Sequence, residues 1–437
     1  MNILHLTAHL GAGAGKAIAG LAIADRSNRH AIAIVEKPQK TNHIDRAISQ
    51  GVPVYICPDD KGIAKLVRDA DVVIINWWHN PEMYRVLSQI STIPCRLVLW
   101  SHLNGLRYPI MNYDFLQWFD FYLFTSRASL ENTLWTNDQR KQLLQRSEVV
   151  LGMGDFDPYK IEAKEDYVLN RPVSIGYVGS LDYAKMHPEY IAWCENALQD
   201  VDAVLKLYGD ALEPIKRDVE KSPIRERIKL CGFCDDIPDV LRNIDLFVYI
   251  LNPQNFATTE NSILEAMAAA LPIIVSDGAA EKAIIDDRVN GIIVSSKETL
   301  KTAIRELLDN DDLRTALGTE ARKKVMEKYT VTENITRLDQ ALNKICHMKK
   351  KTHDLSNVSG YHWFISGCAP KDQEFFRILA KTKEPDGQTV EKIQKLKTIF
   401  TGKTKGSVFQ FAETFPDDKD LMRICKALRK VGEKYES

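Results

Sequence analysis

Short runs of β-branched and other apolar residues alternate with amphipathic segments along the chain up to about residue 345. Such alternation is typical of parallel sheets that are covered by helices on both faces. In the first half, the pattern predicts strands at Asn2–Thr7, His30–Val35, Val52–Ile56, Val72–Asn76, Arg96–Ser101, Tyr122–Thr125 and Glu148–Leu151.

A second series of the same kind follows the polar, acidic stretch of residues 155–171. Its strands are expected at Val173–Val178, Ala203–Tyr208, Ile228–Cys231, Leu246–Ile250, Ile273–Ser276 and Gly291–Val294, with helices at Pro188–Leu198, Glu213–Lys221, Ile237–Asn243, Ser262–Ala270 and Lys297–Leu308. The simplest interpretation is two Rossmann-like halves joined near residues 155–172.

After Ser296 the pattern becomes almost wholly helical, with apolar residues at spacings of three and four. These helices are expected to close the second half. From the lysine run at 349–351 onward, the strand–helix alternation is lost, and helix-like segments occur at Asp372–Leu379, Val390–Phe400 and Lys419–Lys430. We therefore expect three domains: residues 1–160, residues 170–345 and a mostly helical accessory module at 350–437.

The charge distribution supports a separate terminal module. The 437 residues contain 58 Lys and Arg against 59 Asp and Glu, which argues against a uniformly basic nucleic-acid-binding protein. Residues 346–437 carry 18 basic and 12 acidic residues, a net charge of +6, whereas residues 1–345 carry −7. The near-neutral total is thus a cancellation between two parts of the chain.

The sequence contains no run of about 18 apolar residues, and it begins directly with the strand-like MNILHL. We therefore expect a cytoplasmic protein. The eight cysteines are scattered, which favours reduced thiols over a disulfide framework. Cys231 and Cys234 form a CxxC pair without a second pair at zinc spacing, so no metal site is expected.

The loop after the first expected strand reads GAGAGK, at Gly11–Lys16. It is neither a P-loop nor a complete GxGxxG motif, because the spacing of its glycines and of Lys16 does not fit either pattern. Two interpretations stay open: a glycine-rich turn that lets the backbone and the following helix approach an anionic ligand, or simply a tight turn between a strand and a helix.

A stronger pattern lies at 257–277, ATTENSILEAMAAALPIIVSD. A helix beginning near Glu260 would leave the N–H groups of its first turn available to a diphosphate, and Glu265 further along is placed to accept hydrogen bonds from ribose hydroxyls. The alternative for the helix alone is an alanine-rich packing helix with an exposed glutamate.

The segment ENSILEAMAAALPIIVSD resembles the signature of retaining family 4 (group 1) glycosyltransferases of the GT-B fold. Further stretches resemble the family in the same order: MNILHLTAHLGAGAG, IGYVGSLDYAK, LCGFCDDIPDVLRNIDLFVYI and AIIDDRVNGIIV. The resemblance covers about residues 1–345. It implies an α/β protein with two Rossmann-like domains facing a cleft, to which this chain adds a mostly helical C-terminal extension.

The resemblance also implies roles for individual residues. Lys185 matches a lysine that neutralises the leaving diphosphate, and His102 matches a histidine facing the reacting sugar; these are the expected catalytic residues. The expected donor-binding residues are Gly13, Ser180, Lys185, Glu260, Asn261, Ser262, Ile263 and Glu265.

Three positions depart from the family pattern. Ala257 replaces the first glutamate of the signature, which contacts the transferred sugar, and Glu260 lies only three residues further on. Ser180 stands where an arginine is usual, so one expected positive charge is missing. Ala270 replaces a glycine, a change that we expect to be mild because both residues are small.

The acceptor side is expected at the ends of first-half strands, since the carboxyl ends of parallel strands border the ligand site in such sheets. The candidates are Trp77, His79, Asn104 and Arg107. For Trp77 and His79 the alternative is a capped strand end with packed tryptophans.

The sequence thus predicts a retaining glycosyltransferase that moves a sugar from a UDP- or GDP-sugar to a hydroxyl acceptor in polysaccharide or glycolipid synthesis, without a bound metal or other cofactor. The alternatives are a non-catalytic nucleotide-sugar-binding protein, motivated by Ala257 and Ser180, and another GT-B enzyme such as an epimerase. We expect no nucleic-acid partner. The basic, aromatic tail would either contact a glycan, a partner or the inner face of a membrane, or form a helical cap on the catalytic body.

Overall fold

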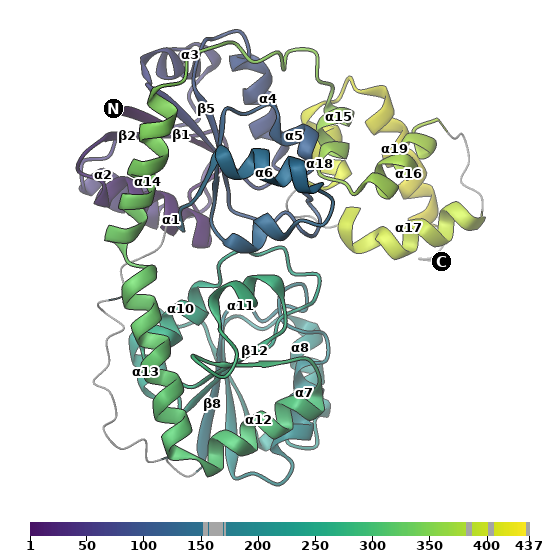
Figure 1. The fold of residues 1–437 in the computed structure, drawn as a ribbon. Coiled ribbons are helices and arrows are strands. Elements are labelled where there is room, and N and C mark those ends of the chain that lie inside the picture. The colour runs from purple at the N-terminus through teal and green to yellow at the C-terminus, as the bar shows by residue number, and fades with distance from the viewer. Residues whose placement is uncertain (152–155, 157–168, 170–171, 382–386, 401–405, 434–437) are drawn as a thin grey trace. The chain divides into compact units, whose positions relative to one another are not determined.

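The computed structural model describes residues 1–151, 156, 169, 172–381, 387–400 and 406–433 (Figure 1). The chain divides into two compact units. The first contains Met1–Gly152 together with Ile335–Ser437, and the second contains Met153–Asn334. Residues 350–437, predicted as an accessory module, thus group with the first half of the chain, while most of the predicted junction at 155–172 lies outside the described residues.

The first unit is built on a seven-stranded parallel sheet in the order β3-β2-β1-β4-β5-β6-β7. Its strands are β1 (Asn2–Thr7), β2 (Arg29–Ile34), β3 (Val54–Ile56), β4 (Val72–Trp77), β5 (Leu97–Ser101), β6 (Phe121–Phe124) and β7 (Ser147–Val149). Its helices up to residue 346 are α1 (Ala12–Ala24), α2 (Asn42–Ser49), α3 (Asp60–Asp69), α4 (Pro81–Ile90), α5 (Tyr113–Leu116), α6 (Asn137–Gln145) and most of α14 (Val331–Cys346).

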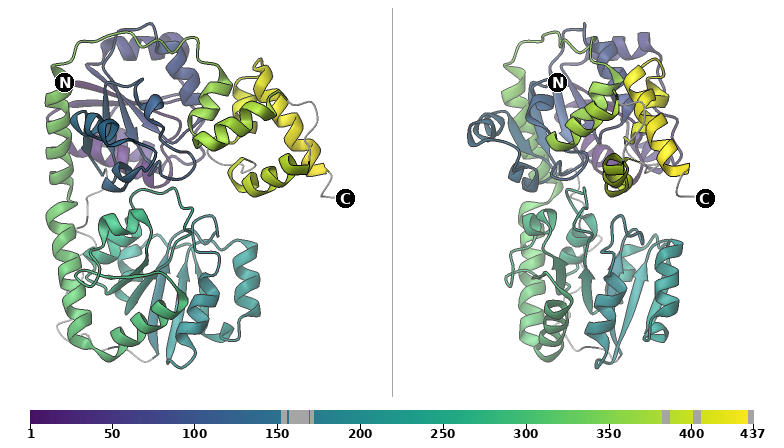
Figure 2. Two further views of the ribbon diagram at one scale, coloured as in Figure 1. Left: turned by 45° about the vertical axis from the view of Figure 1, so that its right-hand side comes forward. Right: turned by 90° about the vertical axis from the view of Figure 1, so that its right-hand side faces the viewer.

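The second unit has a six-stranded parallel sheet in the order β10-β9-β8-β11-β12-β13. Its strands are β8 (Val173–Val178), β9 (Ala203–Tyr208), β10 (Ile228–Gly232), β11 (Leu246–Tyr249), β12 (Ile273–Ser276) and β13 (Ile292–Val294). Its helices are α7 (Tyr190–Leu198), α8 (Glu213–Lys221), α9 (Ile237–Arg242), α10 (Asn261–Ala268), α11 (Ala279–Ile284), α12 (Lys297–Asp309) and α13 (Asp311–Lys328). Figure 2 shows helices on both sides of this sheet.

Every strand expected from the sequence is present, and the two parallel sheets confirm the predicted α/β class. Strands of this kind are recognisable because residues buried on both faces form continuous apolar runs, as in β4, where every residue is buried. No helix of the described residues is both long and apolar enough to cross a membrane.

The C-terminal helices pack on the first unit beside α4 (Figures 1 and 2). They are α15 (Gly360–Ser366), α16 (Pro370–Leu379), α17 (Gly387–Phe400), α18 (Val408–Thr414) and α19 (Lys419–Glu433). The Trp363 ring of α15 stacks on Tyr84 of α4, with ring centroids 4.5 Å apart. The Asn112 side chain donates to the carbonyls of Ser366 (2.7 Å) and Cys368 (2.9 Å). The cap interpretation of this segment therefore agrees with how the described helices pack.

Candidate functional site

The loop between β8 and α7 positions Lys185 at the carboxyl edge of the second sheet. Its backbone is held by Asn252, just beyond β11. The Asn252 N–H donates to the Lys185 carbonyl (2.8 Å), and the Asn252 side chain donates to the Tyr183 carbonyl (2.7 Å). The loop after β8 and the segment after β11 are thus tied together.

The ammonium of Lys185 forms an ion pair with Glu260, with Nζ 3.0 Å from Oε2. The Glu260 side chain is only 2% exposed and is held by two further donors. Tyr249 Oη donates to Oε2 (3.0 Å), and Asn255 Nδ2 donates to Oε1 (3.1 Å). Burial alone would lower the pKa of Lys185, but Glu260, together with Tyr177 and Glu265, outweighs it, so the pKa lies above the ordinary value. Lys185 is therefore a fixed cation.

The Glu260 carboxylate, predicted to bind the donor, is enclosed against Lys185 and Tyr249. At position 257, where the family has its first glutamate, the Ala257 N–H donates to Asn255 Oδ1 (3.1 Å). Asn255 thus connects the Ala257 backbone to the Glu260 carboxylate.

Helix α10 begins directly after Glu260. Asn261 and Ser262 are partly exposed in its first turn, whereas Ile263 is fully buried. The Ile263 N–H donates to the Glu260 carbonyl (3.0 Å), and the start of the helix carries the positive end of its dipole. Glu265, 7% exposed, follows one turn later and is close enough to raise the pKa of Lys185. The structure therefore brings these donor-side candidates together, while their roles in binding stay predictions.

The end of this segment corrects one expectation. Ala270 has φ +56°, in the left-handed region that favours glycine. Replacing the family's glycine by alanine there is not mild, because the alanine Cβ costs about 1 kcal/mol in this conformation. Gly318 of α13 packs so closely on this point that a Cβ on it would lie 2.1 Å from the Ala270 carbonyl oxygen.

Ser180 is exposed just after β8, and its carbonyl accepts a hydrogen bond from Tyr177 Oη (3.3 Å). Its side chain supplies no charge where the family has an arginine.

Sequence reasoning missed Glu281, at the same edge of the sheet. Glu281 is 4% exposed, and Ser276 Oγ lies 2.8 Å from its Oε1. Burial, aided by the negative charge of Glu260, raises the pKa of Glu281 to about 7.

In the first unit, the glycine-rich stretch proves to be mostly helical. Helix α1 begins at Ala12, so Gly13 lies exposed in its first turn and not in a loop. Gly15 allows a close approach, because a Cβ there would lie 2.2 Å from the Leu10 carbonyl oxygen. The position of Gly13 is consistent with an anion-facing amide, which stays a prediction.

His102 follows β5 and is partly exposed, with Nε2 3.0 Å from Asn76 Oδ1 at the end of β4. Burial lowers its pKa to about 3, so the ring is neutral near pH 7. The Trp78 ring lies between His102 (centroids 5.8 Å apart) and His9 (4.8 Å). His9 and Trp78 are thus neighbours of His102, and both follow strands whose carboxyl ends meet here.

Asn104 and Arg107 lie in the same loop. Asn104 is 4% exposed, and its Oδ1 accepts from the N–H groups of Leu106 (2.8 Å) and Arg107 (3.4 Å). This pattern makes Asn104 a turn-forming residue. Arg107 is exposed. Of the two, only Arg107 presents its side chain to solvent.

Trp77 and His79 do not face solvent, which corrects the prediction that they contact an acceptor. Trp77 is 1% and His79 0% exposed. The Trp77 Nε1 donates to Tyr84 Oη (2.8 Å), and His79 Nδ1 lies 2.6 Å from the same oxygen. The C-terminal helices cover this cluster, with Phe411 of α18 5.1 Å from the His79 ring centre. The alternative of packed rings at a capped strand end is the one observed.

The described residues contain no group of three or more His, Cys, Asp or Glu side chains suited to hold a metal ion. Cys231 is exposed and Cys234 partly exposed, and both are free thiols. Independence from a bound cation stays a prediction.

The second unit is similar in sequence to known proteins. Residues 172–310 match the family described as glycosyl transferases group 1, and this stretch contains Lys185, Glu260 and Glu265. The UDP-Gal:α-D-GlcNAc-diphosphoundecaprenol α-1,3-galactosyltransferase of Escherichia coli is 22% identical over 153 residues, which are 33% of this chain and 38% of that protein. The chain thus aligns with well under half of this relative.

Solved structures match over a longer range. HepE of Anabaena, determined with UDP and glucose, has a TM-score of 0.62 and 17% identity, covering 79% of this chain and 100% of that one. A glycosyltransferase of Rickettsia africae has a TM-score of 0.62 and 14% identity, covering 79% of this chain and 99% of that one. The predicted GT-B fold of two Rossmann-like domains, with a helical C-terminal region added, is confirmed.

Proposed function

We propose that this chain is a retaining family 4 glycosyltransferase that moves a sugar from a UDP-sugar to a hydroxyl acceptor in glycolipid or polysaccharide synthesis. The observation that carries the proposal is the pairing of Lys185 with Glu260 at the start of α10, within the group 1 domain. A cation beside the positive end of a helix supports the binding of a nucleotide diphosphate at this point.

The reaction then needs no protein nucleophile. The bond from the sugar's anomeric carbon to the diphosphate breaks as the acceptor hydroxyl attacks the same face, and the departing phosphate takes the hydroxyl proton. Lys185 and the N–H groups of α10 stabilise the negative charge that develops on the diphosphate. Glu265 would accept hydrogen bonds from the ribose hydroxyls. For His102, whose ring is neutral near pH 7, the role of hydrogen-bonding a sugar stays part of the proposal.

The nucleotide is assigned from the neighbours. HepE was solved with UDP and with UDP-glucose, and the E. coli relative is named for a UDP-sugar donor and a lipid-linked acceptor. These names support uridine over guanosine. Ala257 and Ser180 keep a second candidate in view, a nucleotide-sugar-binding protein without transferase activity, because both lack the charge that the family has there.

A donor panel tests the proposal. We expect the chain, incubated with UDP-glucose, UDP-galactose, UDP-N-acetylglucosamine and GDP-mannose, to release UDP slowly from one or more UDP-sugars even without an acceptor. Thermal stabilisation by a UDP-sugar with no release of nucleotide would support the binding protein instead. Conversion of the sugar without its loss from the nucleotide would identify an epimerase, and release from GDP-mannose alone would overturn the choice of uridine.

The proposal also includes contact between the outer face of α19 and a membrane surface. Its buried side, which includes Leu421, Ile424 and Cys425, faces the other C-terminal helices. The exposed side chains described on it include Lys419, Met422, Arg423, Lys426, Arg429 and Lys430. Arg423 pairs with Asp420 (3.3 Å), and the other cations make this face mainly basic, which fits an anionic lipid surface and would bring a lipid-linked acceptor near.

Flotation with phosphatidylglycerol vesicles tests this contact. We expect the full chain to float with these vesicles at low salt and not with phosphatidylcholine vesicles. The double variant Lys426→Gln/Lys430→Gln should lower partitioning about thirtyfold, at about 1 kcal/mol for each cation. The matched control is Lys216→Gln/Lys221→Gln on α8, which should float like the parent. Substitution is preferable to truncation, because the C-terminal helices cover Trp77 and His79. Equal flotation of both double variants would exclude this face.

A further inference from the structure

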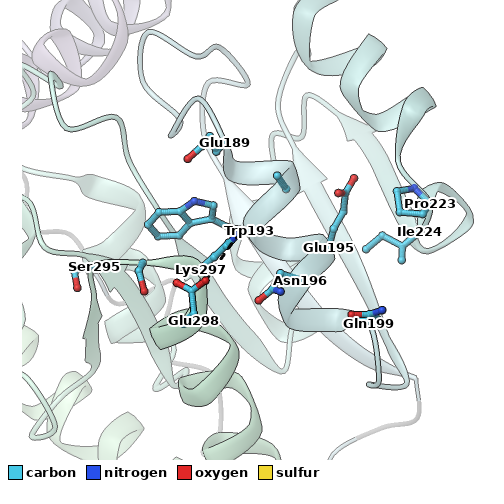
Figure 3. A pocket seen from close by; sticks show the side chains of 12 residues that line it. Glu189, Trp193, Glu195, Asn196, Gln199, Pro223, Ile224, Ser295, Lys297 and Glu298 are labelled. Atoms are coloured by element: carbon cyan, nitrogen blue, oxygen red, sulfur yellow. Dashed lines mark ion pairs between the residues drawn. The ribbon is translucent and has the colours of Figure 1, made fainter.

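A groove of about 650 Å³ follows the outer side of α7 in the second unit (Figure 3). Trp193 lies at its centre. Residues at the start of α12 form one side, and the turn at Pro223 and Ile224 forms the other, with Glu195 beside it. The groove is lined by Glu189, Ala192, Trp193, Glu195, Asn196, Gln199, Pro223, Ile224, Ser295, Ser296, Lys297 and Glu298. None of the predicted donor-site residues is among them.

The lining combines an aromatic ring with planar polar side chains. Asn196 and Gln199 carry amides, while Glu189, Glu195 and Glu298 carry carboxylates. Such groups accept and donate pairs of hydrogen bonds at the spacing of neighbouring hydroxyls, and an indole edge with Pro and Ile offers contact for C–H groups. The volume falls in the range of small-molecule sites.

The charge of the groove narrows the ligand class. Three carboxylates face one cation, Lys297, which itself lies 4.0 Å from Glu298. The resulting net charge of about −2 disfavours nucleotides, phosphates and acidic glycans. In addition, Asn196 Oδ1 is shielded from solvent and accepts no hydrogen bond in the structure. A hydroxyl-rich ligand would supply the missing donor after a small side-chain movement.

The position of the groove is also informative. Glu189 lies four residues after Lys185, so the groove begins at the same edge of the sheet as the lysine. It then follows α7, whose nine residues span about 14 Å. We propose that this groove binds a short, uncharged oligosaccharide. The inference goes beyond the transfer reaction and does not depend on it, because binding is measured without turnover.

Saturation-transfer NMR with neutral trisaccharides tests the proposal. The panel consists of maltotriose, cellotriose and chitotriose, added at millimolar concentration to the full chain. We expect at least one to bind, and its affinity to fall at least tenfold in the double variant Glu195→Ala/Gln199→Ala. Both side chains are at least partly exposed, so the substitutions should not disturb folding. The matched control, Glu220→Ala on the exposed side of α8, should bind like the parent.

Two further experiments are needed. One distinguishes a sugar in this groove from a sugar in the transfer site, and the other distinguishes a sugar from a cationic ligand. Binding should persist in Lys185→Ala and in saturating UDP; competition by UDP would place the sugar in the transfer site and overturn the proposal. Hexalysine serves as the probe for a cationic ligand. If hexalysine binds and no trisaccharide does, the groove is a peptide site, and if a trisaccharide binds equally to the double variant, it binds elsewhere.

Discussion

Replacing Lys185 by alanine should lower kcat for sugar transfer at least tenfold, equivalent to at least about 1.4 kcal/mol of barrier. The reason is that Lys185 is held as a fixed cation at the start of α10 by Glu260, 3.0 Å away. A preorganised charge stabilises the departing diphosphate without reorganising as the bond breaks. The measurement is initial-rate kinetics with the UDP-sugar identified by the donor panel, and Lys216→Ala, which removes an exposed lysine of the same unit, is the control.

A second variant separates the effect of the Glu260 charge on Lys185 from the role of the ion pair in holding the loop. Glu260→Gln keeps the size of the side chain but removes the negative charge beside Lys185, so the ammonium becomes available to the diphosphate. We therefore expect UDP to bind several-fold more tightly to Glu260→Gln and more weakly to Lys185→Ala, as measured by calorimetry. Parent-like turnover in Lys185→Ala would contradict the role of Lys185 in stabilising the departing diphosphate. Equal weakening of UDP binding in both variants would mean that the ion pair only holds the loop together.

The sequence was most informative where function depends on local pattern. The strands are continuous apolar runs, and α10 with Glu265 is visible because its signature occupies one unbroken segment. The ion pair between Lys185 and Glu260 was not predictable, because the two residues lie 75 positions apart and meet only through the tie between Asn252 and the Lys185 loop. Likewise, nothing in the sequence places Ala270 at positive φ.

Trp77 and His79 were placed wrongly for a physical reason. The rule that strand ends border the ligand site assumes that no other element covers them, but the C-terminal helices do. This contact depends on two glycines, Gly367 and Gly406: a Cβ on Gly367 would lie 2.5 Å from the His79 ring, and one on Gly406 would lie 2.3 Å from the His79 carbonyl oxygen. Helix α18, whose Phe411 completes the cover, was not predicted either. The aromatic content of the tail was the available signal, since exposed rings need a partner surface.

Mild acid should destabilise the first unit before the second. His5 and His79 are 0% exposed, and burial lowers the pKa of His79 to about 3 and that of His5 well below its ordinary value. His5 Nε2 lies 2.9 Å from His30 Nδ1, and His30 Nε2 lies 2.9 Å from Asp25 Oδ2. The Asp25 carboxylate accepts from His30 Nε2–H, so His30 Nδ1 accepts from His5 Nε2–H. The other ring nitrogen of His5, Nδ1, has no hydrogen-bond partner.

The direction in which the free energy of unfolding changes with pH follows from proton binding. Above pH 6.5 these histidines are neutral in both folded and unfolded chains, and their neutral forms cost nothing. Below pH 6.5 the unfolded chain binds protons that the folded first unit excludes until about pH 3 for His79. The free energy of unfolding therefore falls by about 1.4 kcal/mol per pH unit for each histidine of this unit whose pKa burial lowers, His102 included. The pKa of Asp25 lies below its ordinary value of 3.8, so this carboxylate adds to the loss of stability only below about pH 3.8.

The second unit contains a group, Glu281, whose titration changes stability in the opposite direction. Glu281 has a pKa raised from 4.5 to about 7, so the folded unit binds its proton first, and its contribution to stability increases as the pH falls from 7 toward 4.5. The pKa of His187 in the same unit is lowered by burial, which opposes this gain in part. Hydrogen exchange measured by mass spectrometry at pH 7 and pH 5.5, corrected for intrinsic rates, follows each unit separately. We expect protection to fall in β1 and β4 and to be kept or to rise in β11 and β12. His79→Asn, which tolerates the φ of +60° at this position, should reduce the first effect, and Glu281→Gln should abolish the second. A uniform loss of protection in both units would contradict the assignment of these buried groups.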